Sequence, residues 1–215
     1  MMPRRTALYS VNTFFIPAIL MAAVLGLCGC SAIVSSATSD MMAHLSRSVS
    51  DNNDLALVED GAPAFLLMID SLILKDPGNE KTLVSAANLY TTYAGLFVTD
   101  KDRASKMAAK ALDYAGRALC LSDEKACGLK GRPFDQARPL VLQMDKDQVP
   151  ALFALGSAWA RWIMANRDDF NAIADLAHIE LIMQQVARLE PGYRDGAAFI
   201  YLGTLSCLLP PSLGG

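Results

Sequence analysis

Histidine is scarce in this chain: only two occur in 215 residues, His44 and His178, and they lie far apart. Histidine is the commonest general base and metal ligand, so little material exists for either role. The patterns G-x-S-x-G and H-E-x-x-H and a glycine-rich phosphate loop are also missing. No carboxylate pair and no set of metal ligands surrounds His178 in the sequence. We therefore interpret His178 as a residue with a structural role. We expect no enzyme activity, no bound metal and no cofactor.

The sequence also lacks an excess of basic residues, with 19 Lys and Arg against 22 Asp and Glu. It contains no basic block and no patch in which aromatic and basic residues are interleaved. Proteins that bind nucleic acid carry a basic footprint of this kind. The composition therefore argues against nucleic acid as a partner.

The apolar run near the start of the chain, residues 14–27, has about 15 residues and is too short to span a bilayer. It follows Arg4 and Arg5, an order typical of a secretory signal peptide. It ends in "LCGC", which resembles the bacterial lipobox of an aliphatic residue, two small residues and a cysteine. That resemblance implies removal of residues 1–29 and acylation of Cys30, and more than one acyl chain gives stable membrane attachment.

The residues after the lipobox suggest where the mature chain is held. Ser31 stands where an Asp would signal retention in the inner membrane of enteric-type bacteria, so we expect the periplasmic face of the outer membrane. Residues 30–53 are rich in Ser, Ala, Asp and Asn and are expected to form a lipidated tether. Residues 54–215 are enough for one domain with a sizeable core.

Of the five cysteines, Cys28 leaves with the signal and Cys30 carries lipid, which leaves three. Cys120 and Cys127 flank "LSDEKA", where a helix passes into a loop, and are candidates for a disulfide in an oxidising compartment. Two unrelated small apolar residues are the alternative. Cys207, within "YLGTLSCLLP", is expected to be a buried free thiol.

Strand signals are almost absent, whereas apolar residues recur at helical spacing through the chain. The expected helices cover 64–75, 80–97, 102–122, 135–144, 149–166, 168 or 169 to 190, and 194–209. Turns such as "KDPGN" and "EPGYRDG" contain the Pro and Gly that end helices. Long helices joined by short turns predict an all-α fold of stacked antiparallel hairpins.

Three segments of the sequence align with one another: "LVSAANLYTTYA", "LFALGSAWARWI" and "FIYLGTLSCLLP". Their pattern resembles the tetratricopeptide repeat, in which small residues let paired helices approach closely. The matching residues are Ala86-Ala87 with Tyr90, Leu155-Gly156 with Trp159, Leu202-Gly203, and the closing prolines Pro77 and Pro191. The insertions between the segments predict a divergent stack instead of a regular array.

Almost the whole chain resembles one family, the tetratricopeptide lipoprotein that is the T component of TRAP transporters. The resemblance rests on the lipobox, "LILKDPGNEKTLVSAANLYTTYA", "ALDYAGRAL", "VPALFALGSAWARWI", "ARLEPGY" and "AAFIYLGTLSCLLPPSLGG". It implies an accessory periplasmic lipoprotein that partners a TRAP solute-binding protein and assembles as a homotrimer. A pore-like cavity would hold or pass a hydrophobic or organic-acid ligand.

In that family a further helix follows the Gly-Gly, so the domain 54–215 is expected to be incomplete at its C-terminal end. Apolar residues of the last helix are then expected to lack part of their cover: Phe199, Leu202, Leu205 or Leu208.

The same resemblance makes aromatic residues of the first helices candidates for lining the ligand cavity: Tyr90, Tyr93, Trp159, Trp162 and Tyr201. A place in the core is the alternative for Trp159, which holds the repeat's own packing position. The alternative function is a tetratricopeptide scaffold lipoprotein for envelope or outer-membrane protein assembly. Co-purification with cell-wall enzymes or barrel assembly factors would distinguish it.

Overall fold

The computed structural model describes residues 40–41, 44–45, 47–49 and 51–208. The signal peptide, Cys30 and residues 209–215 lie outside that range. The chain separates into two units, residues 1–41 and 42–215. Residues 40 and 41 of the first unit are helical, and all the elements that follow belong to the second.

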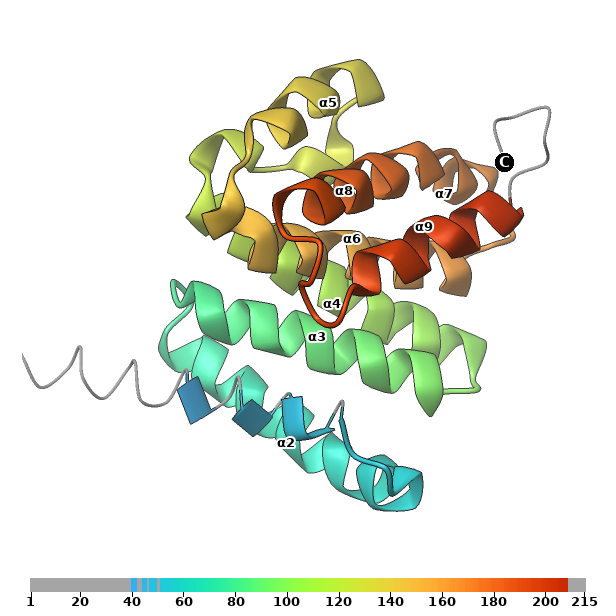
Figure 1. Ribbon diagram of the computed structural model, residues 1–215. Helices are drawn as coiled ribbons and strands as arrows, with labels where there is room; N and C mark the ends of the chain where they lie inside the picture. The colour runs from blue at the N-terminus through green and yellow to red at the C-terminus, as the bar shows by residue number, and fades with distance from the viewer. Residues whose placement is uncertain (1–39, 42–43, 46, 50, 209–215) are drawn as a thin grey trace, which may run out of the picture. The chain divides into compact units, whose positions relative to one another are not determined.

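Every regular element among the described residues is helical, which confirms the all-α prediction (Figure 1). The α-helices are α2 (Leu55–Lys75), α3 (Glu80–Leu96), α4 (Lys101–Ser122), α5 (Phe134–Gln143), α6 (Val149–Ala165), α7 (Phe170–Ala174), α8 (Leu176–Leu189) and α9 (Ala197–Leu208). The short 3₁₀ helices are η1 (Glu124–Ala126), η2 (Leu129–Gly131) and η3 (Lys146–Gln148).

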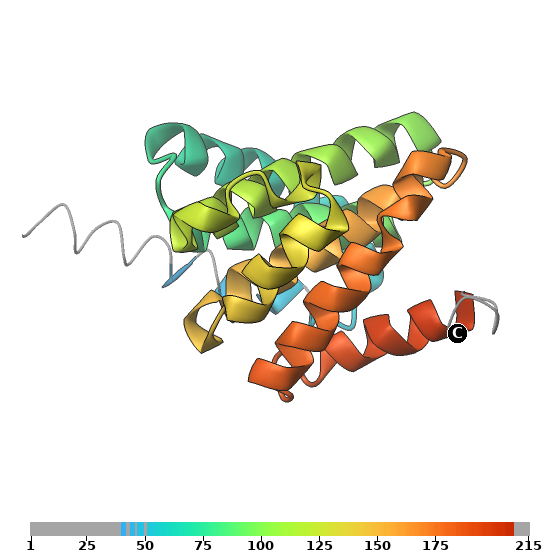
Figure 2. The same ribbon diagram turned by 90° about the horizontal axis from the view of Figure 1, so that it is seen from above.

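The helices of the second unit form a stack of hairpins. Helices α3 and α4 pack along each other, α4 packs on α6, and α6 packs on α8. Helix α3 also contacts α6 directly, so the first helices of successive hairpins lie side by side. The three aligned segments of the sequence fall in α3, α6 and α9. Seen from above, α9 starts at the end of α8 and diverges from it at an open angle (Figure 2).

Capping side chains set several helix starts. Asp54, Asn79 and Asp100 precede α2, α3 and α4, and each carboxylate or amide oxygen accepts from the backbone N–H three residues further on, at 3.1, 3.0 and 2.8 Å. Such caps satisfy one of the amide groups that the first turn leaves without a partner. The ends of these helices therefore lie within one or two residues of the sequence predictions, apart from the start of α2.

Helix α2 begins nine residues before the predicted start at 64, since its first residue is Leu55. The predicted start followed directly on Pro63, and proline removes a helical hydrogen bond, which usually ends a helix. Val58 and Ala62 are buried and continue the apolar stripe of Leu66 on the same face. Packing of that stripe outweighs the cost of one proline.

The predicted helix from 168 or 169 to 190 is two helices in the structure, α7 and α8, which meet at Asp175. Its start is correct, because the Asp169 side chain caps α7. The last helix begins at Ala197 and not at 194. Arg194, Asp195 and Gly196 have φ of 48°, 58° and 79°, left-handed values that a right-handed helix does not contain.

The glycine of the middle aligned segment lies where two helices approach closely, as predicted. A Cβ on Gly156 in α6 would stand 2.7 Å from atoms of Ile182 and Met183 in α8. The same prediction is wrong for Gly203 in α9, because no described atom lies within 4 Å of its added Cβ. Helix α9 packs on α8 through another face.

That face of α9 carries Ala198 and Leu205, which are buried, while Phe199 and Ile200 are 53% and 70% exposed. Cys207 is a free thiol and is exposed, so the prediction that it is buried is wrong. Among the described helices, α9 packs chiefly on α8, and its Tyr201 also contacts Phe153 of α6. Within the described range, no helix is long and apolar enough to cross a membrane.

Candidate functional site

The five aromatic candidates do not share one cavity. Tyr90 and Tyr93 line a cavity of about 370 Å³ between α2, α3 and α4. Trp162 lines another, of about 530 Å³, between α4, α6 and residues 126–130. Tyr201 lines both a polar cavity of about 560 Å³ and an apolar cavity of about 490 Å³. Trp159 is fully buried in the core.

Trp159 on α6 contacts residues at and just after the junction of α7 and α8. Its Nε1–H donates to Asp175 Oδ2 at 3.1 Å, and its ring lies 5.0 Å from that of His178. His178 is itself buried, with Nε2 3.2 Å from the carbonyl oxygen of Arg132. The two rings thus pack as part of the core, which is the alternative place that the sequence suggested for Trp159.

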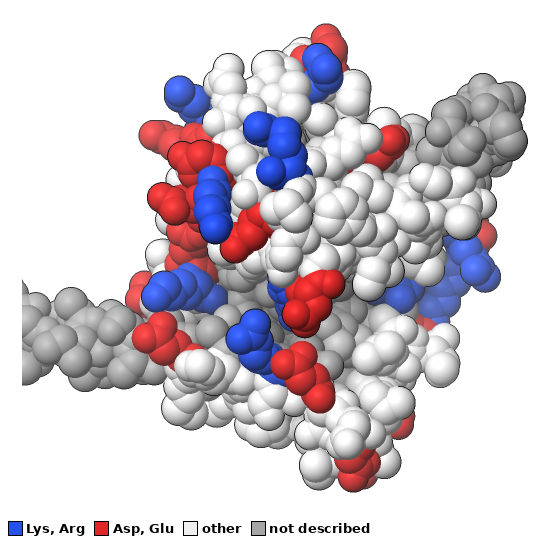
Figure 3. Space-filling model, in the orientation of Figure 1, with Lys and Arg blue, Asp and Glu red and all other residues white. Residues whose placement is uncertain are grey.

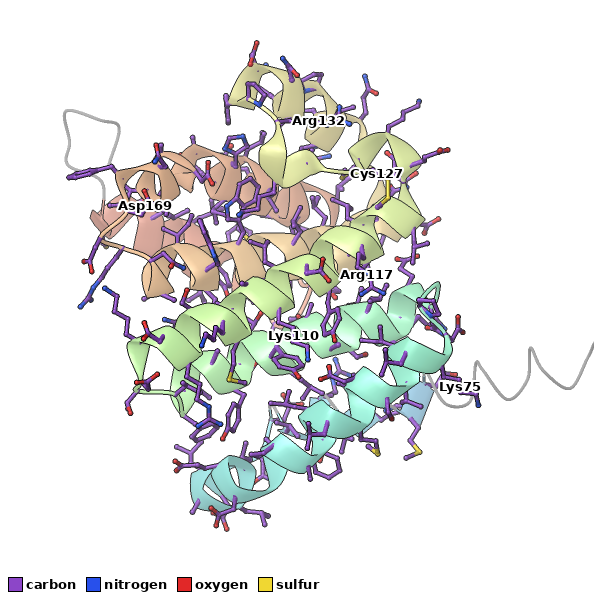
Figure 4. The ribbon with its side chains drawn as sticks, turned by 180° about the vertical axis from the view of Figure 1, so that it is seen from behind. Lys75, Lys110, Arg117, Cys127, Arg132 and Asp169 are labelled. Atoms are coloured by element: carbon purple, nitrogen blue, oxygen red, sulfur yellow. A yellow bond between two sulfur atoms is a disulfide. The ribbon has the colours of Figure 1, made fainter. Side chains whose placement is uncertain are left out.

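Tyr90 belongs to a polar network at the edge of its cavity. Its hydroxyl donates to Asp70 on α2 at 2.7 Å, and Lys110 on α4 forms an ion pair with the same carboxylate (Lys110 is labelled in Figure 4). Burial, and next the hydrogen bond to Asp70, raise the pKa of Tyr90 above its usual range. The Tyr90 hydroxyl is thus part of a polar network, centred on Asp70, that joins α2, α3 and α4.

Trp162 lies in its cavity beneath a lysine. The Lys130 ammonium stands 3.8 Å from the centroid of the Trp162 ring, within cation–π distance.

Cys120 lines the same cavity as Trp162. The structure joins it by a disulfide to Cys127, the pair expected from the sequence, with the Cα atoms 4.3 Å apart (Figure 4). The bond holds the last turn of α4 against the loop after η1.

The polar cavity is the one formed between the first helices of the hairpins, and most of its lining residues are polar. It is lined by Arg47, Asp51, Asn88, Thr91, Thr92, Phe153, Ser157, Arg194, Asp195, Ala197 and Tyr201. These residues come from the segment before α2, from α3, from α6, and from α9 with the turn before it. Figure 3 shows charged side chains around a hollow at the centre of this face.

The turn before α9 places an arginine, Arg194, in the lining of the polar cavity. Arg194 adopts a left-handed conformation that costs a non-glycine residue about 1 kcal/mol or more, a kind of strain that gathers at functional sites. Its guanidinium lies 5.7 Å from the centroid of the Phe153 ring on α6. The fold therefore holds a cation in the wall of this cavity at a conformational cost.

A second arginine, Arg161, lies near Tyr201 but is not among the residues that line the polar cavity. Arg161 lies one turn beyond Ser157 on α6, and its Nη1 is 3.3 Å from where a Cβ of Gly95 would be. Gly95 in turn lies one helical turn beyond Thr91 on α3. Burial raises the pKa of Tyr201, and the charges of Arg194 and Arg161 act against that shift, so both guanidinium groups lie near this phenol.

Thr91 and Arg194, which line the polar cavity, were not among the candidates that the sequence suggested. The aligned segments carry a signal for the polar wall of the cavity, because Asn88 pairs with Ser157 in them. Polar residues at the same position of two otherwise apolar helices indicate a shared polar face. Among the described residues, no group of His, Cys, Asp and Glu is arranged to hold a metal.

A stack of helical hairpins with a solute-sized cavity between its first helices is an architecture typical of binding and docking proteins. The family model of the TRAP transporter T-component matches residues 51–215 of this chain. The chain therefore belongs to the TRAP transporter T-component family, which is not a family of enzymes, and its role is accessory to a TRAP transport system. The search of curated proteins found no match.

Proposed function

We propose that this chain is a periplasmic lipoprotein that partners the solute-binding protein of its TRAP system and holds or passes an organic solute. The observation that carries the proposal is the polar cavity of about 560 Å³ between α3, α6 and the turn before α9. Cavities of this size fit small molecules. In an accessory component of a transport system, such a cavity suits transient storage of the transported solute.

The sequence supports the location. The lipobox ending at Cys30 follows a signal of secretory length, and Ser31 favours the outer membrane. A periplasmic anchor would bring the domain to the compartment in which solute-binding proteins work. The homotrimer remains a prediction, for which the exposed Phe199 and Ile200 of α9 offer an apolar surface.

The partner is tested with the full-length chain purified from membranes in detergent and the solute-binding protein encoded beside it. Saturable binding that a non-cognate solute-binding protein does not reproduce is the expected result. Recovery of cell-wall enzymes or barrel assembly factors from periplasmic extract, with no solute-binding protein, would favour the scaffold alternative.

The anchor is tested by Cys30→Ala, with Cys28→Ala as the matched control. The first variant should leave the membrane fraction as a soluble or unprocessed chain, and the second should remain bound and carry acyl mass. Complete retention of the processed Cys30→Ala chain in membranes would show that the anchor lies elsewhere.

A further inference from the structure

A groove lies between α2 and α4, two helices that both pack on α3 but make little direct contact with each other. Its recess is the cavity of about 370 Å³, and α3 forms the floor with the buried rings of Tyr90 and Tyr93. The ion pair between Lys110 on α4 and Asp70 on α2 bridges the two walls (Figure 4). The groove is therefore a fixed feature of the fold, because the bridge sets the distance between its walls.

One wall of the groove carries a row of cations. Arg103, Lys106 and Lys110 all line the cavity, and spacings of three and four residues place them on one face of α4. Lys110 is neutralised by Asp70, but none of the ion pairs found between described residues includes Arg103 or Lys106. The described residues that line the cavity include no carboxylate. Two positive charges of this wall thus have no acidic partner within the described part of the chain.

The rest of the groove is largely apolar. Leu66 and Leu67 on α2 and Met107 on α4 line it beside the two tyrosine rings. Leu67 is 72% exposed, although it is a large apolar side chain next to the recess. Exposed apolar surface that is rimmed by charged groups marks an interaction site more often than chance placement does.

The shape of the groove separates two occupants that combine negative charge with apolar groups, an acidic protein surface and an anionic bilayer. Leu66 and Tyr93 are 5% and 7% exposed, so the floor lies well below the ridge formed by Leu67. A bilayer surface is flat on this scale and would touch the ridge alone. A protruding side chain of a protein partner reaches the floor, as the anchor residues of protein interfaces do in their pockets.

We propose that the groove between α2 and α4 is the docking site for an acidic protein surface, whose carboxylates pair with Arg103 and Lys106 and whose apolar anchor side chain enters the cavity beside Leu67. The partner assigned to it is the solute-binding protein, so the inference rests on the proposed function and adds the surface at which that partner docks. The groove and the polar cavity share no lining residue. Docking here therefore leaves the polar cavity uncovered by these contacts.

The charge row is tested by binding of the full-length chain in detergent to the immobilised cognate solute-binding protein. Arg103→Glu with Lys106→Glu should weaken the affinity by about tenfold or more, mainly through slower association, because like charges would then meet. Lys125→Glu with Arg138→Glu is the matched control. It makes the same change in net charge at exposed positions of η1 and α5, and should stay within about twofold of the wild type.

Salt provides a second readout of the same charges. Raising NaCl from about 0.1 M to about 1 M shortens the screening length from about 10 Å to about 3 Å. Binding of the wild type should weaken steeply over this range, whereas the variant with Glu in place of Arg103 and Lys106 should lose little, since its attraction is already gone. Equal salt dependence of the two chains would contradict the role of these cations.

The apolar anchor is tested by Leu67→Ser, which should weaken binding about fivefold or more, mainly through faster dissociation. Leu142→Ser on α5, another exposed leucine, is the control and should bind as the wild type does. Since Arg103, Lys106 and Leu67 are all exposed, these variants should fold, and circular dichroism checks that they do.

The outcomes separate the inference from the proposed function. A solute-binding protein that binds the wild type and all of these variants equally contradicts the groove and leaves the proposed function standing. Failure of the wild type to bind any solute-binding protein contradicts the partner in the proposed function, and the inference with it. Sedimentation of the Cys30→Ala chain with phosphatidylglycerol vesicles that depends on Arg103 and Lys106 would make the groove a membrane contact and overturn the inference.

Discussion

Tyr90 on α3 donates a hydrogen bond from its hydroxyl to Oδ2 of Asp70 on α2, at 2.7 Å. Tyr114 on α4 donates to the other carboxylate oxygen, also at 2.7 Å, and Lys110 on α4 completes the set as an ion pair. Both tyrosine rings are buried, so these bonds form away from bulk water. Since α2 packs chiefly on α3, this carboxylate is the polar link that fixes α2 to the α3–α4 hairpin.

Asp70→Ala should lower the free energy of unfolding by about 1–3 kcal/mol, because three donors lose their common acceptor in a largely buried place. Urea unfolding followed by circular dichroism measures the change. Asp60→Ala, at an exposed position of the same helix, is the control and should change stability by less than about 0.5 kcal/mol. Equal effects of the two substitutions would show that Asp70 has no special role.

The same network predicts a loss of stability at alkaline pH. Burial, and then the hydrogen bond and charge of Asp70, raise the pKa of Tyr114 from 10.0 to about 12. The folded chain therefore holds this proton more tightly than the unfolded chain. The resulting stabilisation is complete below pH 10 and is lost as the pH rises from 10 to about 12.

Denaturation midpoints measured across that pH range test this coupling. Tyr114→Phe should be less stable than the wild type below pH 10, and the difference should shrink toward pH 12. Tyr193 and Tyr201 also have raised pKa values, because they are buried, and contribute alkaline sensitivity to both proteins. A difference that stays constant with pH would mean that the Tyr114 proton is not coupled to folding.

The sequence predicts most of the fold because its helices are signalled locally, by apolar periodicity and by capping residues such as Asn79 and Asp100. Where it fails, a tertiary contact outweighs the local signal. Because Val58 is buried in the core, α2 starts before Pro63 and continues past it. The bond from Trp159 to Asp175 lies at the junction of α7 and α8, which periodicity alone read as one helix.

The candidate site was harder to predict, because the direction of a side chain depends on which helices face one another. Tyr90 and Trp159 occupy the same position of two aligned segments, and both turn into the packed interior instead of one shared cavity. The Arg161 guanidinium on α6 packs against Gly95 on α3, where a larger side chain would crowd it. That register between α3 and α6 cannot be derived from either segment alone.

The disulfide closes a short loop between the end of α4 and η1. Replacing both Cys120 and Cys127 by Ser should lower the free energy of unfolding by about 2–3 kcal/mol, the value for so short a loop on the chain-entropy model. Cys207→Ser is the control, because that thiol is free and exposed, and should have little effect. Mass spectrometry of non-reduced peptides checks the bond itself, and two free thiols at Cys120 and Cys127 would contradict it.

The two glycines that align between α6 and α9 should respond to alanine in opposite ways. In Gly156→Ala the new methyl group would stand 2.7 Å from side-chain atoms of Ile182 and Met183, closer than real contacts allow, so these side chains or the two helices must shift. Overpacking of this kind lowers stability by about 1–3 kcal/mol. In Gly203→Ala no described atom lies within 4 Å of the added methyl group, and the gain in helix propensity should raise stability by up to about 1 kcal/mol. Thermal unfolding of the two variants beside the wild type measures the loss of stability and the gain of stability in one experiment.

If Gly156→Ala were as stable as the wild type, the close approach of α6 and α8 would be wrong. If Gly203→Ala were strongly destabilising, a packed neighbour would have to cover that face of α9.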